Sequence, residues 1–267
     1  MRRYAVIEKN IGETPLMAVE AFRKENPTLS SLPMTYAGRL DPMASGKLVV
    51  LIGDECKRRT RYDKLDKTYV FEILLGFHTD TGDVLGLAER GPNASVSEHA
   101  AIAAARTHRG THTLPYPAFS SKTVNGKPLF KYALENELSS IEIPNTDMRV
   151  HSIRYLDRVV VPKDELIERI LNKIDRLKVR HDIDELGAGF RKEAIIEQWW
   201  NLRDRCKTPY TILRYETTVG SGTYIRTLAP LLAQSLGMPG LAYSINRTKI
   251  GRYVPIVGGF GVWTRTL

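Results

Sequence analysis

One loop limits how this chain can fold, because it places a proline and two glycines around a single carboxylate. The loop is Tyr36-Ala37-Gly38-Arg39-Leu40-Asp41-Pro42-Met43-Ala44-Ser45-Gly46. Pro42 has a fixed φ and disfavours a helical backbone at Asp41, and the two glycines give the turn freedom on both sides. The apolar run Leu48–Ile52 that follows predicts a buried strand. We therefore expect a rigid loop that presents Asp41.

Length and charge bound the class of protein. With 267 residues, of which 42% are hydrophobic, the chain can form one large domain or one domain with an insertion. Its formal net charge of +9 indicates a polyanionic partner such as nucleic acid, although general solubility is an alternative reason. Six of the eleven residues in Lys57–Lys67 are basic, which fits either phosphate contacts or a solvated helix face.

Cysteine usage and hydropathy favour the cytoplasm. Cys56 and Cys206 lack the spacing of metal ligands and cannot form a disulfide framework, which fits a reducing compartment. The sequence has no apolar run near the roughly 20 residues of a membrane helix, and we expect no membrane association. His78, Asp80 and Asp83 resemble metal ligands, but no second carboxylate cluster accompanies them. We interpret both aspartates as turn residues that bind backbone amides, and we expect no metal.

Several segments carry local sequence patterns that predict helices and strands. Thr14 and Pro15 are typical of a helix start, and the helix should end near Asn26. The capping-box pattern of 95–98 should open a second, alanine-rich helix that runs to about Arg109. Strand patterns occupy 4–8, 67–76, 148–161, 211–219 and 242–253. This mixture predicts an α+β fold with a curved, mostly antiparallel sheet flanked by helices.

Four motifs in this order resemble the TruB family of pseudouridine synthases, the tRNA pseudouridine-55 synthases. The Asp41 loop is similar to the family's Gly-x-Leu-Asp-Pro-x-Ala-[Ser/Thr]-Gly loop, and 79–86 to its Thr-Asp-Thr-x-Asp-x-x-Gly hairpin. Segment 115–133 resembles Pro-x-Tyr-Ser-Ala-x-Lys-x-x-Gly-Lys-x-x-Tyr-x-x-Ala, and 222–227 matches Gly-Thr-Tyr-Ile-Arg-Thr. The resemblance covers about 1–162 and 208–260. It implies the pseudouridine synthase fold and isomerisation of a uridine in the T loop of tRNA.

The same resemblance assigns roles to individual residues. Asp41 would be the catalytic carboxylate, Arg226 its salt-bridge partner and Tyr69 the aromatic ring that stacks on the target base. Residues that would contact RNA or the base are Tyr36, Arg39, Lys9, Lys57, Arg58, Ile245 and Arg247. The reaction breaks the C1′–N1 bond, rotates the uracil and rejoins it through C5, so no cofactor is expected. The carboxylate could attack C1′ or take a proton from C2′, and the sequence leaves both open.

Two positions in the loop depart from the family pattern. Tyr36 stands where the family commonly has a histidine that is thought to help open the RNA loop. Arg39 is unusual for this family, while an Arg-x-Asp arrangement is typical of other pseudouridine synthase families. We therefore hypothesise that Arg39 takes part in flipping the target base out of its stack.

The domain organisation also differs from the family. Residues 163–207 carry helical spacing and a Trp199-Trp200 pair, and we expect a helical insertion that projects from a single catalytic domain covering 1–267. The chain ends at Leu267, soon after the last motif, so we expect no C-terminal RNA-binding domain of the PUA type. The resemblance also implies a monomer with tRNA as its partner. The alternatives are a synthase for a site in ribosomal or messenger RNA, and an RNA-binding tRNA chaperone without essential catalysis.

Overall fold

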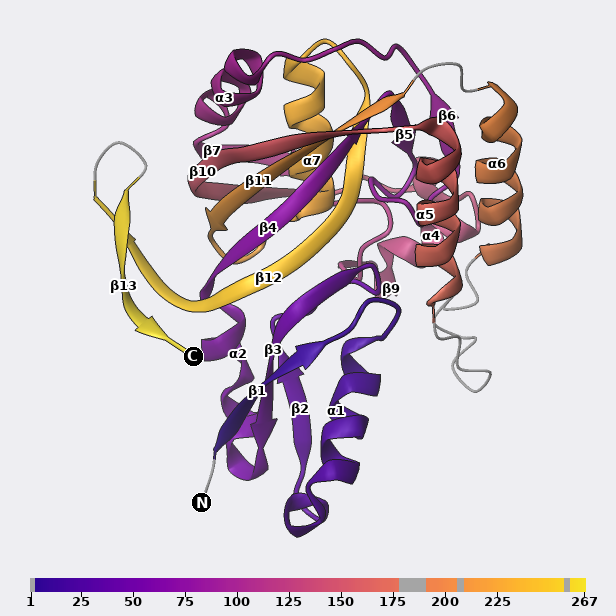
Figure 1. The fold of residues 1–267 in the computed structure, drawn as a ribbon. Coiled ribbons are helices and arrows are strands. Elements are labelled where there is room, and N and C mark those ends of the chain that lie inside the picture. Colours follow the sequence, from indigo (N-terminus) through magenta and orange to yellow (C-terminus); the bar gives the residue numbers. More distant parts are fainter. Residues whose placement is uncertain (1–2, 178–190, 206–208, 257–259) are drawn as a thin grey trace.

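The computed structural model describes residues 3–177, 191–205, 209–256 and 260–267. Within these ranges nine strands form one curved sheet in the order β1-β3-β12-β4-β11-β10-β7, with β2 beside β3 and β13 beside β12 (Figure 1). The strands of this sheet are β1 (Tyr4–Lys9), β2 (Met34–Ala37), β3 (Ala44–Ile52), β4 (Asp66–Leu75), β7 (Gly110–Pro115), β10 (Asn145–Val161), β11 (Tyr210–Val219), β12 (Gly240–Pro255) and β13 (Gly261–Thr266).

The sheet is antiparallel apart from one contact between its two halves. Residues Ile245, Asn246 and Arg247 of β12 pair in parallel with Ala44, Ser45 and Gly46 of β3. The other pairings in the sheet are antiparallel. The predicted α+β class with a mostly antiparallel sheet is therefore confirmed. The parallel contact places β12 directly beside the end of the Asp41 loop.

Helices flank the sheet, and two small hairpins each lie between a strand of the sheet and the next helix. The helices are α1 (Pro15–Glu25), α2 (Arg59–Asp63), α3 (Glu98–Thr107), α4 (Leu129–Leu134), α5 (Lys163–Asp175), α6 (Lys192–Arg205) and α7 (Ile225–Ser235), with short 3₁₀ segments at Pro27–Leu29, Gly53–Arg58 and Leu138–Ser140. The hairpins are β5 (Phe77–Thr79) with β6 (Ala88–Arg90) and β8 (Thr123–Val124) with β9 (Lys127–Pro128). The predicted cap of α1 is present, since the Thr14 hydroxyl accepts a hydrogen bond from the Met17 amide at 3.2 Å.

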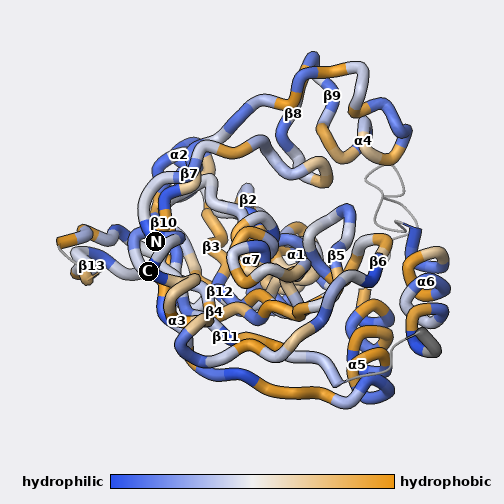
Figure 2. Tube along the Cα trace, turned by 90° about the horizontal axis from the view of Figure 1, so that it is seen from above, coloured by the Kyte–Doolittle hydropathy of each residue, from blue (hydrophilic) through white to orange (hydrophobic). Residues whose placement is uncertain are grey.

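Apolar side chains pack on both faces of the central strands. On one face, Phe71 and Ile73 of β4 pack with residues of α3 and α7; on the other, Leu74 packs with residues of α5 and α6. Figure 2 shows this concentration of hydrophobic residues along β12, β4, β11 and α5. Successive side chains of a strand point to opposite faces, so Ile73 and Leu74 of β4 are both buried but belong to different faces of the sheet. The sheet thus has a two-sided core at the end that carries α5 and α6.

The helical insertion does not project as the sequence analysis expects. Its described helices, α5 and α6, lie side by side against the sheet, and both contribute buried residues to the second core face (Figure 1). Trp199 is completely buried, whereas its neighbour Trp200 is 52% exposed. The expectation of an appendage is therefore wrong, since an amphipathic helix pair buries its apolar stripe on the nearest apolar surface. Residues 178–190 and 206–207 of the insertion lie outside the described ranges.

Candidate active site

The Asp41 loop joins β2 to β3, and its backbone is fixed on both sides of the carboxylate. Gly46 has a φ of 101°, a conformation that favours glycine. A Cβ atom at Gly46 would also lie 2.3 Å from the carbonyl oxygen of Arg247, so the close approach of β12 requires a glycine there. On the other side, the Gly12 amide donates to the Pro42 carbonyl oxygen at 2.8 Å. The turn before α1 therefore supports the loop from behind.

Arg247 binds the main chain at both ends of this loop. Its side chain is 1% exposed. The guanidinium donates to the carbonyl oxygens of Gly38 at 2.8 Å, Arg39 at 3.3 Å and Lys47 at 2.7 Å. A planar fork with several donors suits three acceptors that converge in this way. Arg247 therefore fixes where the loop leaves β2 and where it enters β3.

Lys9 is a second buried cation below the loop. It is 1% exposed, and its ammonium donates to the carbonyl oxygens of Asn10 at 2.8 Å, Glu13 at 2.7 Å and Pro42 at 3.5 Å. Burial lowers the pKa of Lys9 to about 8, and the nearby carboxylate of Glu13 opposes this fall. The sequence-based expectation that Lys9 and Arg247 contact RNA is corrected here, because both side chains are enclosed and bind protein carbonyl groups.

Asp41 and Arg226 form the predicted ion pair. Nε of Arg226 lies 2.8 Å from Oδ2 of Asp41, and the Asp41 side chain is 33% exposed while that of Arg226 is 4% exposed. The Arg226 guanidinium also donates to the carbonyl oxygens of Thr81 at 2.8 Å and Phe119 at 3.1 Å. Burial alone would lower the pKa of Arg226, but the neighbouring carboxylates raise it above its usual value. The guanidinium is therefore permanently charged and fixed in orientation beside a partly open carboxylate.

Asp83 is the site residue that the sequence analysis missed as a partner of Arg226. It is 3% exposed, and its Oδ1 accepts hydrogen bonds from the Leu85 amide and the Thr81 hydroxyl, each at 2.9 Å, which is the predicted turn role. Its Oδ2 also lies 3.6 Å from Nε of Arg226. Burial raises the pKa of Asp83 to about 6, while Arg226 opposes the rise. The 79–86 hairpin motif contains Asp83, but the spacing of the motif does not predict the contact between Asp83 and Arg226.

Tyr69 and Ile245 lie on neighbouring strands, β4 and β12, next to the residues that flank Asp41. Both belong to the apolar cluster that includes Leu40 and Ala44, and they are 7% and 4% exposed. Ile245 pairs with Ala44 across the parallel contact. The structure therefore gathers Asp41, Tyr69 and Ile245 around one short stretch of the sheet, with both apolar side chains packed against the base of the loop.

A partly exposed aromatic and basic group lies beside the loop. Nη2 of Arg39 is 3.4 Å from the hydroxyl of Tyr36, and the guanidinium of Arg59 lies 5.1 Å from the Tyr36 ring centroid. Arg59 is also paired with Asp63, which accepts a hydrogen bond from the amide of Gly38. This group, Tyr36 with Arg39 and Arg59, presents an aromatic ring and positive charge at the surface. Arg59 belongs to the basic run Lys57–Lys67, but its sequence context gives no reason to select it as a site residue.

Lys57 and Arg58 are also exposed, as an RNA contact would require. Their side chains are 81% and 51% exposed and are paired with Asp54 at 2.8 Å and Glu55 at 3.4 Å. Such surface pairs contribute little energy and can be exchanged for phosphate contacts. Both residues lie in the turn that precedes α2, and α2 carries Arg59.

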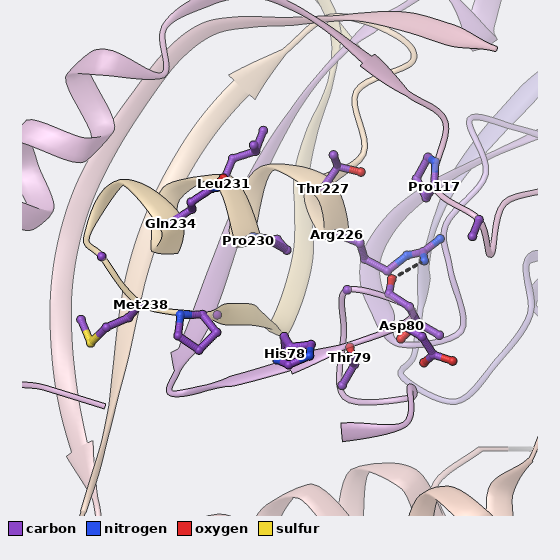
Figure 3. A pocket seen from close by; sticks show the side chains of 16 residues that line it. His78, Thr79, Asp80, Pro117, Arg226, Thr227, Pro230, Leu231, Gln234 and Met238 are labelled. Atoms are coloured by element: carbon purple, nitrogen blue, oxygen red, sulfur yellow. Dashed lines mark hydrogen bonds between the residues drawn. The ribbon is translucent and has the colours of Figure 1, made fainter. Parts of the chain in front are cut away.

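A hollow of about 670 Å³ lies behind Arg226. Its walls come from the β5–β6 turn and from α7, with Thr79 and Asp80 on one side and Thr227, Pro230 and Gln234 on the other (Figure 3). Asp41 is not part of this wall. Among the residues that the structure describes, no group of three or more His, Cys, Asp or Glu side chains is arranged to bind a metal ion. The described ranges also contain no helix that is long and apolar enough to cross a bilayer.

The fold and the site together define the class of protein to which this chain belongs. The chain superposes on the solved structure of a Cbf5-Nop10-Gar1 complex with a TM-score of 0.53 and 15% identity, covering 93% of this chain and 49% of that one. The curved sheet with an aspartate loop at its centre is the fold of the pseudouridine synthases. The model of the TruB family pseudouridylate synthases, N-terminal domain, matches residues 29–166. The chain therefore belongs to the TruB family.

Curated relatives agree with this assignment. The tRNA pseudouridine synthase B of Caldicellulosiruptor saccharolyticus is 31% identical over 157 residues, which are 59% of this chain and 53% of the relative. That of Lactobacillus delbrueckii subsp. bulgaricus is 28% identical over 250 residues, 93% of this chain and 68% of the relative. The chain thus spans between half and about two thirds of the length of these relatives.

Proposed function

We propose that this protein isomerises uridine to pseudouridine in the T loop of tRNA, with Asp41 as the catalytic carboxylate. The observation that carries the proposal is the Arg226–Asp41 pair: a buried, fixed guanidinium beside a carboxylate that is one-third exposed, on a rigid loop. Because Arg226 binds Oδ2, we assign Oδ1 to the ribose of the target nucleotide. There it would attack C1′ or accept the proton from C2′ while the C1′–N1 bond breaks.

Tyr69 and Ile245 would form the floor on which the detached uracil rotates. Their position beside Leu40 supports this assignment, since an apolar floor holds a planar base without fixing its rotation about the ring normal. Re-addition through C5 then forms the new bond to C1′ as the Oδ1–C1′ bond breaks or, on the other route, as Asp41 returns the proton to C2′. The proton on C5 leaves, and N1, which kept the electron pair of the broken bond, takes up a proton. No electron donor or group donor is needed for this rearrangement, so the proposal names no cofactor.

The partly exposed Tyr36, Arg39 and Arg59 group would meet the RNA beside the flipped nucleotide. Extruding a base costs a few kcal/mol, which stacking on a ring and charge contacts with phosphates can offset. Lys57 and Arg58 would add phosphate contacts on the same side. We further propose that the protein acts on tRNA as a monomer in the cytoplasm.

The test uses unmodified tRNA transcripts, purified protein without added cofactor, and chemical mapping of pseudouridine for wild type and Asp41→Asn. Pseudouridine in the T loop with wild type and none with Asp41→Asn supports the proposal. Product at another RNA position would replace the substrate with ribosomal or messenger RNA. Salt-sensitive tRNA binding and refolding by both forms, with no product from either, would favour the chaperone alternative.

A further inference from the structure

The inner face of α6 is bonded to the β5–β6 turn, the segment between Thr79 and Ala88. The indole N–H of Trp199 donates to the carbonyl oxygen of Val84 at 3.1 Å, and the side-chain amide of Gln198 donates to that of Ala88 at 2.8 Å. The Trp199 ring is completely buried and packs against Phe77 of β5, with 5.2 Å between ring centroids. The helical insertion therefore holds both strands of this hairpin.

Arg191, at the start of α6, contacts two further segments. Its guanidinium lies 2.7 Å from the carboxylate of Asp80, in the β5–β6 turn, and 4.9 Å from the ring centroid of Phe119. The Arg191 and Asp80 side chains are 26% and 35% exposed, so solvent screens this pair only partly. Arg191 thus links the turn to the loop that follows β7.

These two segments carry the groups that orient Arg226. Thr81 and Asp83 belong to the β5–β6 turn, and the third partner, the carbonyl oxygen of Phe119, belongs to the loop after β7. The helical insertion contacts both the β5–β6 turn and the loop after β7. A displacement of either segment would therefore move the acceptors that fix the guanidinium beside Asp41.

The turn is held by β12 and Arg226 along part of its length, and its remaining part borders open space. Gly82 lies against the main chain of Arg226, and its carbonyl oxygen accepts a hydrogen bond from the Ala242 amide of β12 at 2.9 Å. Thr79 and Asp80 instead line the hollow of about 670 Å³, with Pro230 and Gln234 of α7 across it (Figure 3). A segment that borders open space has few contacts to prevent it from shifting. The hydrogen bonds and packing from α6 add to the restraint that β12 and Arg226 give the turn.

We propose that the helical insertion positions the active site: Gln198, Trp199 and Arg191 hold the β5–β6 turn and thereby set the orientation of Arg226 and Asp41. They are positioning residues, and the proposal rests on the proposed function for its catalytic consequence. Small misplacements of an orienting group lower a rate strongly while leaving substrate binding intact. The insertion would thus act on the chemical step although it lies on the opposite face of the sheet from α7.

The first test measures amide hydrogen exchange and needs no substrate. Variants Gln198→Met and Trp199→Phe each remove one donor to the turn and keep an apolar side chain of related shape; Trp200→Phe is the matched control on the exposed side of α6. We expect exchange in 79–88 and 225–228 to rise at least fivefold in the two variants and to stay unchanged in the control. Unchanged exchange in both variants would overturn the proposal, whatever the substrate proves to be.

The second test measures kcat and KM on a tRNA transcript. We expect Gln198→Met and Trp199→Phe to lower kcat about tenfold at unchanged KM, and to have no further effect in an Arg226→Lys background. Equal, additive losses in both backgrounds would show that the insertion does not act through Arg226 and would overturn the catalytic part. If wild type itself forms no pseudouridine, the proposed function fails, and the exchange result still decides the positioning role.

Discussion

Two buried arginines lie on either side of Asp41 and differ in what they bind. Arg247 donates to three main-chain carbonyl oxygens, whereas Arg226 donates to the Asp41 carboxylate and lies close to a second one, Asp83. The first arrangement determines where the loop runs, and the second determines how its carboxylate is directed. The same residue type therefore serves the folding of the loop at one end and its chemistry at the other. Substitutions can separate the two roles.

The largest effect should follow from Arg226→Lys. Lysine keeps the positive charge but replaces a fork that reaches Asp41, Thr81 and Phe119 with a single ammonium. We expect kcat to fall about 1000-fold, which corresponds to about 4 kcal/mol in the activation free energy. Single-turnover assays with saturating tRNA transcript would measure it, with thermal unfolding as the control for folding. A variant that keeps most of its kcat would remove the orienting role from Arg226.

Arg247→Met should affect the stability of the fold more than the rate of the chemical step. Three carbonyl oxygens lose their donor, and we expect the free energy of unfolding to fall by about 3 kcal/mol. Denaturant unfolding would measure this, with Arg252→Met as control because Arg252 is an exposed residue on the same strand. The control should change stability by less than about 0.5 kcal/mol. If both variants were equally stable, the comparison between the two arginines would fail.

Arg39→Ala tests the partly exposed group beside the loop. The side chain contacts the Tyr36 hydroxyl at the surface, so we expect kcat/KM for tRNA to fall about tenfold, roughly 1.4 kcal/mol, with little change in stability. Lys24→Ala on α1 removes an equally exposed cation and serves as control. Activity equal to wild type would contradict a part for Arg39 in base flipping.

The smallest effect concerns pH and Asp83. Protonation would remove one of the two carboxylates at Arg226, so wild-type kcat should decline a few-fold as the pH drops through about 6. Asp83→Asn should lack this inflection. Because burial raises the folded-state pKa above the ordinary 3.8, proton uptake favours the folded state below about pH 6 and this contribution is lost above it. Parallel rate and unfolding profiles from pH 4.5 to 7.5 would reveal either result.

The sequence predicted the elements of the fold well because their signals are local. The Thr14 cap, the apolar run of β3 and the alternation along β4 each depend on neighbours within a few residues. The site residues Asp41 and Arg226 came from motifs whose chemistry depends on residue identity. For these features, the local pattern and the tertiary arrangement require the same side chains.

Other features depend on contacts between distant segments. Arg247 and Lys9 resemble surface cations in sequence, but acceptors on the Asp41 loop enclose them. Asp83 carries an ordinary turn signal, and its second contact arises only after α7 packs nearby. The periodicity of α5 and α6 predicts an apolar stripe on each helix, but it does not show which surface the stripe packs against. Tertiary contacts decided each of these cases.

The parallel contact between β3 and β12 also has a consequence for synthesis. The Asp41 loop is made early in translation, whereas Arg247, which binds its two ends, follows about 200 residues later. Contacts with such sequence separation form late in folding. A nascent chain that has not yet extruded β12 therefore carries the carboxylate without the loop geometry around it. Competence for catalysis would arise in one step, when β12 enters the sheet.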